Sequence, residues 1–226
     1  MPTTNTETGA VLAPTTIGIT GKRDLLGKDA AVRAALAEIF DRLDRDFAAA
    51  PKTLLTSLAD GADRIAAEEA TGRAQWQTVA VLPLEPQIYA QDFDAAGAAW
   101  LRSYLASGAA RVDVLPMLIN PGTGRAYELA DVARIPDRIN PARAAHYEQA
   151  GLYIANAATL LVAVKARDEK PGKIGGAARI VDYRLTGRLD DAAQDIVRRS
   201  QVLSRDPPAG GTQLGPCWLI DLASLA

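Results

Sequence analysis

Two adjacent cations follow the first strand-like run of the sequence. The apolar residues 17–19 lead to Thr20 and Gly21, after which the chain presents Lys22 and Arg23. A turn that places positive charge at the end of a buried strand is either ordinary solvated surface or one wall of a site for an anion. These four residues alone leave both interpretations open.

Two more glycine-bearing loops have the same character. Asp60, Gly61 and Asp63 occur in "ADGAD", and Gly175 and Gly176 occur in "RDEKPGKIGG". Glycine permits close backbone approach, and the first turn of a helix offers free N–H groups with partial positive charge, so together they are typical of anion sites. Residues 165–188 contain seven Lys/Arg and three acids, the clearest local excess of positive charge. Neither the P-loop pattern nor the G-x-G-x-x-G fingerprint is present.

Strands that alternate with helices must position these loops. The sequence predicts strands at residues 17–20, 53–58, 78–84, 111–116, 159–166 and 217–222. This alternation predicts an α/β fold: a Rossmann-like, doubly wound, mostly parallel sheet of about six strands with helices on both faces. In such sheets ligands bind beyond the carboxyl ends of the strands, where the winding reverses. We therefore expect the three loops to lie close together.

The chain is expected to form one domain. A polar, Thr-rich tail at residues 1–14 precedes a single domain at 15–226, and a long loop at 117–138 is expected to be functional or mobile. The expected strand order runs 78–84, 53–58, 17–20, 111–116 and 159–166, with 217–222 as a further strand.

Composition excludes several classes of function. The 226 residues carry a net charge of −2, which argues against a general attraction to nucleic acid or to an anionic membrane. One cysteine, Cys217, excludes an internal disulfide, and one histidine, His146, excludes a His-rich metal centre. We expect no metal or cofactor. No apolar run approaches the roughly 20 residues of a membrane helix, and the N-terminus lacks a signal-peptide pattern, so a cytoplasmic protein without membrane insertion is expected.

Three other candidates have simpler explanations. His146 has no evident nucleophile and orienting acid beside it, which favours a structural histidine over a general base. Arg143 could contact a phosphate and Tyr147 could stack on a base, although core packing with a surface salt link is the simpler interpretation of the pair. Asp60 and Asp63 could be helix caps.

The order of short motifs resembles that of a known superfamily. "IGITGKRDL" is similar to the G-x-T-G-H-R opening of SLOG-type Rossmann domains, and it is followed in the typical order by "LLTSLADGADRIAAEEA", "AVLPL" with "YAQDF", "YEQAGLYI" and "GGAARIV". The resemblance covers residues 15–187. It implies binding of nucleotides or nucleotide-derived molecules such as ADP-ribose-like compounds, in some members by sensors of bacterial antiviral or stress systems. The LOG branch instead cleaves nucleoside monophosphates at the base–ribose bond.

The resemblance also implies roles for residues in each loop. The residues that would line the phosphate or ribose region are Thr20, Gly21, Lys22 and Arg23. Those that would approach the ligand closely or take ribose hydroxyls are Gly61, Asp60 and Asp63. Those that would cradle phosphate are Gly175, Gly176 and the N–H of Ala177.

Several departures from the family pattern bear on activity. Lys22 stands where histidine is usual, which keeps positive charge but removes a titratable imidazole, and Ala177 stands where threonine is usual. Acids expected around the fifth strand are replaced by Thr159 and residues 166–167. The LOG motif is degraded in "PGKIGGAARIVD", where only Asp182 lies near the place of the catalytic glutamate. These losses favour binding over hydrolysis.

The sequence thus predicts a module that binds a phosphate-bearing nucleotide derivative without cleaving it. We expect a homodimer or higher homo-oligomer, with a separate effector protein as a further partner and no nucleic acid. Two alternatives stay open: a LOG-type nucleoside-monophosphate phosphoribohydrolase, and a scaffold domain without a ligand.

Overall fold

Short aliphatic and β-branched runs form a six-stranded parallel sheet in the computed structural model, which describes residues 15–135, 138, 140–203 and 214–225. The strands are β1 (Thr15–Gly21), β2 (Lys52–Thr56), β3 (Trp76–Leu82), β4 (Ala110–Val114), β5 (Leu160–Lys165) and β6 (Cys217–Asp221). Every neighbouring pair is parallel. The predicted α/β, doubly wound class is confirmed. The predicted tail at residues 1–14 lies outside the described residues.

The predicted strand order is wrong at one position. The observed order is β4-β3-β2-β1-β5-β6, so β5 lies beside β1, and β4 lies at the outer edge beside β3. The physical reason is the polarity of the two strands. β5 is buried throughout, as a strand covered on both faces must be, whereas no residue of β4 is fully buried: Arg111 is exposed and Asp113 is half-buried. Charged side chains are typical of edge strands, where they discourage pairing with another chain.

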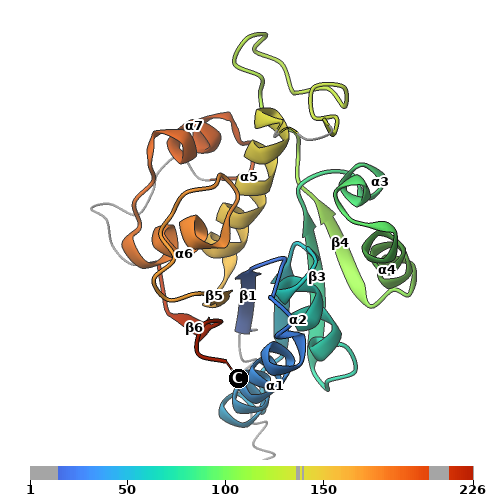
Figure 1. Cartoon of the computed structure of the whole chain (residues 1–226), viewed down its shortest axis with the longest axis vertical. Helices are drawn as coiled ribbons and strands as arrows, with labels where there is room; N and C mark the ends of the chain where they lie inside the picture. The colour runs from blue at the N-terminus through green and yellow to red at the C-terminus, as the bar shows by residue number, and fades with distance from the viewer. Residues whose placement is uncertain (1–14, 136–137, 139, 204–213, 226) are drawn as a thin grey trace, which may run out of the picture.

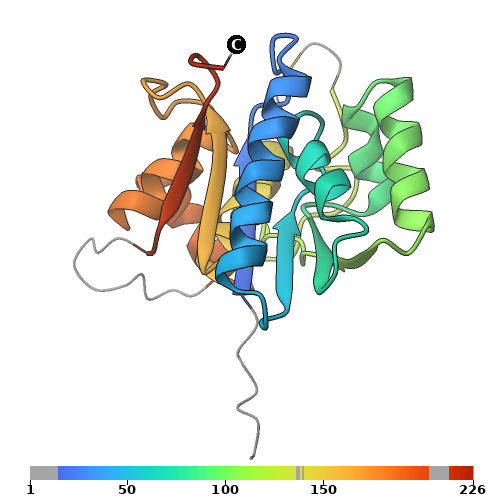
Figure 2. The same cartoon turned by 90° about the horizontal axis from the view of Figure 1, so that it is seen from below.

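Helices cover both faces of the sheet (Figure 1). One face is covered by α1 (Asp29–Asp46), α2 (Ala62–Ala70) and α4 (Ala95–Ala106). The other face is covered by α5 (Pro141–Ala157), α6 (Ala177–Thr186) and α7 (Asp191–Arg199). The short α3 (Pro86–Tyr89) and the 3₁₀ turn η1 (Ala90–Asp92) precede α4. Figure 2 shows α1 lying across the front of the sheet. None of the helices in the described ranges is long and apolar enough to cross a membrane.

The spacing of apolar residues explains how the helices dock. In α1, Val32, Leu36, Phe40 and Leu43 are buried and recur every three or four positions, so they share one face of the helix. They pack on inward-facing residues of β1, β2 and β5. Burying an aliphatic or aromatic side chain contributes about 1.5–3 kcal/mol, which makes this face the main source of the helix's stability.

The segment between β4 and α5 is irregular where it is described. Residues 117–135 contain one isolated antiparallel bridge, between Ile119 and Ala126, and otherwise turns. Leu118 and Val132 are nevertheless fully buried. The Asn140 side chain caps α5 by accepting from Ala142 N–H, and it donates to backbone carbonyls at 131 and 133. The predicted long loop is therefore present and anchored at both of its described ends.

Candidate functional site

A cavity of about 700 Å³ opens at the carboxyl ends of β1 and β5. We call it the carboxyl-end cavity. It lies where the strand order reverses, since β1 pairs with β2 on one side and with β5 on the other. This is the position at which doubly wound sheets bind ligands, and the volume is typical of sites for small molecules.

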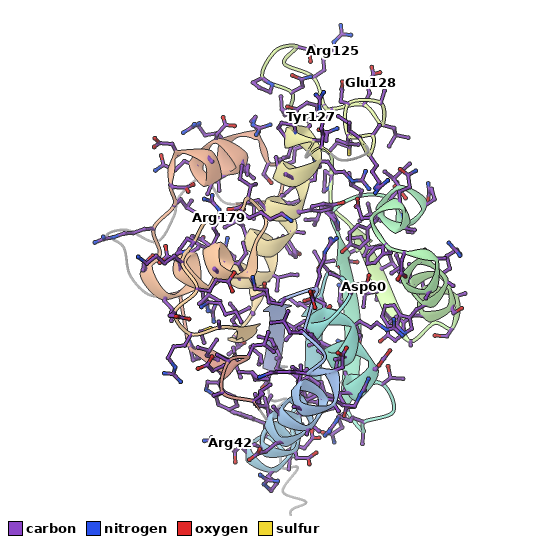
Figure 3. The ribbon with its side chains drawn as sticks, viewed as in Figure 1. Arg42, Asp60, Arg125, Tyr127, Glu128 and Arg179 are labelled. Carbon is purple, nitrogen blue, oxygen red and sulfur yellow. The ribbon has the colours of Figure 1, made fainter. Side chains whose placement is uncertain are left out.

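The cavity collects residues from all three predicted loops. The predicted residues that line it are Thr20, Gly21, Lys22, Arg23, Asp63, Arg143, Gly175, Gly176 and Ala177. Figure 3 shows Arg179 on α6 and Asp60 near the start of α2, on opposite sides of the end of the sheet. Whether these residues hold a ligand stays a prediction.

Asp60 and Gly61 lie outside the cavity lining. Gly61 has a φ of 78°, and a Cβ there would collide with the backbone carbonyl oxygens of Lys22 and Arg23. Gly61 therefore allows close approach to the loop after β1 and not to a ligand. The carbonyl oxygen of Lys22 in that loop also accepts a hydrogen bond of 3.1 Å from Ala62 N–H. Asp60 instead lies against α4, where a Cβ at Gly97 would be 2.9 Å from its carboxylate oxygens.

Asp63 places a buried carboxyl at the cavity. Its residue is only 5% exposed, and its Oδ2 accepts hydrogen bonds from Ser57 Oγ at 2.7 Å and from Ser57 N–H at 3.3 Å. Burial raises the pKa of Asp63 to about 6, against the opposing effect of Ser57. The carboxyl thus bonds to Ser57 and does not cap α2, whose N-cap has no side-chain hydrogen bond.

Two residues beside Asp63 were missed at the sequence level. Ser57 and Tyr89 both line the cavity, and burial raises the pKa of the Tyr89 phenol to about 12. Ser57 directly follows β2, so its place at the carboxyl end of a strand was a usable signal. Tyr89 belongs to α3, which the sequence pattern did not predict as an element.

Arg23 is held by aromatic rings. Its guanidinium carbon lies 5.6 Å from the centre of the Tyr147 ring and 5.7 Å from that of Phe93. Such cation–π contacts orient a cation without neutralising it. Within the described residues Arg23 forms no direct ion pair, although its charge opposes the rise in pKa that burial causes at Asp60 and Asp63, and its side chain lines the cavity.

The glycine loop before α6 offers fewer amides than expected. The N–H of Gly175 donates to the buried carboxylate of Glu148, and the N–H of Gly176 donates to the Lys173 carbonyl at 3.0 Å. The amides of Ala177 and Ala178, in the first turn of α6, have no acceptor in the part of the chain that the structure describes. The predicted phosphate cradle therefore narrows to this first turn.

Arg143 serves as a structural tie. It is buried and donates to Asp92 at 2.7 Å, and to the backbone carbonyls of Val132 and Ile88, each at 2.7 Å. Its Nε also donates to the Tyr147 hydroxyl at 2.9 Å. These bonds join α5 to the segment before it and to α3, so Arg143 packs in the core as the simpler interpretation expected, but its salt link to Asp92 is buried and not at the surface.

His146 is a core residue with both ring nitrogens engaged. Leu118 N–H donates to Nε2 at 3.0 Å, and Nδ1 lies 2.7 Å from the Ala142 carbonyl oxygen, to which it donates in the neutral ring. Burial lowers the pKa of His146. Among the described residues no cluster of His, Cys, Asp and Glu side chains could hold a metal ion.

The cavity lining is electropositive although the chain is not. Eight of its residues are lysine or arginine, and four are aspartate or glutamate. Of these, Lys22 pairs with Glu169 and Arg143 pairs with Asp92. Arg23, Lys170 and Lys173 have no ionic partner among the described residues. The cavity is therefore suited to an anionic molecule.

Comparison with known proteins does not identify this chain. No family model matches its sequence, and no curated protein is significantly similar to it. The resemblance to SLOG-type domains thus has no support beyond the motifs themselves, and function must be argued from the cavity.

Proposed function

We propose that this protein binds a phosphate-bearing nucleotide derivative, of ADP-ribose-like or related chemistry, in the carboxyl-end cavity and acts as a sensor or regulatory module. The observation that carries the proposal is an electropositive cavity at the winding reversal of a protein with a net charge of −2. A local field of this kind concentrates anions at one place without attracting them to the whole surface.

Each part of the cavity suits one part of such a ligand. The free amides of Ala177 and Ala178 form the positive end of the α6 dipole, where a phosphate group is stabilised. Arg23 supplies fixed charge next to it. The carboxyl of Asp63, which lines the cavity, can accept a hydrogen bond from a sugar hydroxyl. The Tyr147 ring, which lines the cavity, suits a base.

A panel of ligands tests the proposal by thermal shift and titration calorimetry. The panel contains ADP-ribose, cyclic ADP-ribose isomers, NAD and mononucleotides. A ligand present at 100 times its dissociation constant should stabilise the protein by about 2.7 kcal/mol. If no member of the panel shifts the transition, the scaffold alternative stands.

Replacing Arg23 by alanine should weaken binding by about tenfold, since a hydrogen bond to a charged group contributes about 1.5–3 kcal/mol. Arg102→Ala is the matched control, because Arg102 is exposed on α4 and does not line the cavity. Titration calorimetry of the two variants measures their affinities for the ligand and tests whether Arg23 contributes to binding. Equal affinities would remove Arg23 from the site.

A hydrolase of the LOG type is the second candidate, and one observation favours it. A buried carboxyl with a pKa of about 6, such as Asp63, is suited to general acid–base chemistry near neutral pH. Asp182, the residue nearest the place of the catalytic glutamate, is exposed and does not line the cavity. Incubation with nucleoside monophosphates separates the two functions, because release of free base would replace the sensor proposal with the hydrolase.

The proposal includes a means of readout. We place the module in the cytoplasm as a homo-oligomer whose assembly, or whose contact with a separate effector protein, responds to the ligand. Light scattering of the protein with and without the bound ligand tests the first route. An unchanged mass would leave the effector protein as the readout.

A further inference from the structure

One ion pair spans the mouth of the carboxyl-end cavity. Lys22 follows β1 and Glu169 lies in the loop after β5, and their side chains form an ion pair although they are 147 positions apart in the chain. Both residues line the cavity. Their side chains are 41% and 27% exposed, so the pair is accessible to solvent and to a ligand. Lys22, one of the cations of the cavity lining, thus already has an internal anion.

The Glu169 carboxylate is poorly satisfied in this arrangement. Oε1 contacts Lys22, whereas Oε2 is buried without a hydrogen-bond partner among the described residues. A buried carboxylate oxygen that loses water without gaining a donor is destabilising. Release of Glu169 into solvent would hydrate its Oε2 again. A ligand anion can therefore replace Glu169 at Lys22 at a lower cost in free energy than the short contact suggests.

The loop that carries Glu169 is fastened at two ends. Near its start, the buried Lys165 ammonium donates to the backbone carbonyls of Ala166, Arg167 and Glu169. At its far end, Gly175 N–H bonds to Glu148. Between these points residues 170–174 are exposed and have no helix or strand. The Lys22–Glu169 pair is the side-chain contact that holds the middle of the described loop against the loop after β1.

We infer that Glu169 is an internal competitor for the anionic ligand, and that ligand binding releases its loop. A phosphate group that enters the cavity takes Lys22 from Glu169, the freed carboxylate turns into water, and the unfastened residues 170–174 lose their contact with the loop after β1. The exchange converts occupancy of the cavity into a change of the exposed surface between β5 and α6. This inference rests on the proposed function and names the regulation of the same site.

Glu169→Gln tests the inference, with Asp168→Asn as the matched control. Both variants lose one negative charge from the same loop, but Asp168 is exposed, forms no ion pair among the described residues and does not line the cavity. The probes are inorganic phosphate and AMP. Removing a competitor of this exposure should tighten binding about fivefold. Asp168→Asn should stay within about twofold of the unmodified protein, because distant exposed charges are screened.

A double variant shows whether Lys22 mediates the effect. In a Lys22→Ala background, Glu169→Gln should leave the affinity for phosphate unchanged, because the ammonium for which the two anions compete is absent. A fivefold gain that persists in this background would overturn the competition and leave only a general effect of charge.

Hydrogen exchange supplies a readout that needs no ligand. The hydrogen-bonded amides of Glu169 and Gly176, at the two ends of the released segment, should exchange faster in Glu169→Gln than in Asp168→Asn, and saturating phosphate should raise their exchange in the unmodified protein toward the Glu169→Gln level. Equal affinity and equal exchange in the two variants, with phosphate still bound, would overturn the inference and leave the proposed function intact. Absence of phosphate and AMP binding in all variants would overturn both. Weaker binding in Glu169→Gln would show that Glu169 contacts the ligand directly.

Discussion

At the scale of single residues, the carboxyl-end cavity is defined by groups whose charge is unusual for their surroundings. Asp63 is buried next to Ser57, and Arg23 is held between aromatic rings, where its charge opposes the effect of burial on the pKa of Asp63. The sequence identified both, because each belongs to a glycine-bearing segment that lies between a strand and the helix after it. It missed Glu169, since nothing in a local pattern indicates an ion pair with a residue 147 positions away.

Asp63 makes stability depend on pH in a predictable direction. Its native pKa of about 6 lies above the ordinary value of 3.8, so the native protein holds a proton that the unfolded chain releases. The folded state therefore loses stability as pH rises from about 4 to about 6, and the loss is complete above that range. Asp63→Asn removes the ionisable group and should stabilise the protein by about 3 kcal/mol at pH 8, and by much less at pH 4.

Urea unfolding of Asp63→Asn at the two pH values measures this effect. Asp168→Asn is the control, because its carboxyl is exposed. The expectation fails if Asp63→Asn is no more stable than the unmodified protein at pH 8, which would mean that the hydrogen bonds from Ser57 compensate fully for burial.

At the scale of elements, the loops after β1 and β2 are in direct contact with each other. Gly61 touches the loop after β1, and a Cβ at Gly21 would clash with Ala62 at the start of α2. The sequence predicted the loops as ligand contacts, whereas part of their glycine content serves loop–loop packing. Hydrophobic periodicity identifies helices and strands, but it contains no information on which backbones approach each other.

Gly61 and Gly72 form a matched pair for testing loop packing. Both have positive φ, 78° and 82°, but a Cβ at Gly72 meets nothing within 4 Å whereas one at Gly61 collides with two backbone carbonyls. Gly72→Ala should destabilise the protein by about 1–2 kcal/mol through backbone conformation alone. Gly61→Ala should destabilise it by at least about 3 kcal/mol, because the ψ of −123° at Gly61 is unfavourable for any residue with a Cβ and because the β1 and β2 loops must also separate.

Denaturant midpoints of the two variants check this difference. The same two variants also report on the cavity when their affinity for AMP is measured. Gly61→Ala should weaken AMP binding, whereas Gly72→Ala should not. Equal midpoints for the two variants would mean that the loop after β1 relaxes without loss.

At the scale of the whole molecule, the fold class and the site region follow from the sequence, and the strand order does not. Alternating strands and helices predicted the parallel doubly wound sheet, and the rule for its carboxyl edge predicted where the cavity lies. The predicted strand order was wrong because no local pattern in the connection after β4 indicates which strand pairs with β4. Arg111 and Asp113 were the available indication of an edge strand.

The place of β5 beside β1 also has a consequence for synthesis of the chain. β1, β2, β3 and β4 are translated first, yet β1 obtains its second neighbour only from residues 160–165. Until that segment leaves the ribosome, β1 is an open sheet edge with a fully apolar middle, residues 17–19. Nascent chains of about this length should therefore be the ones most prone to aggregate and most in need of a chaperone.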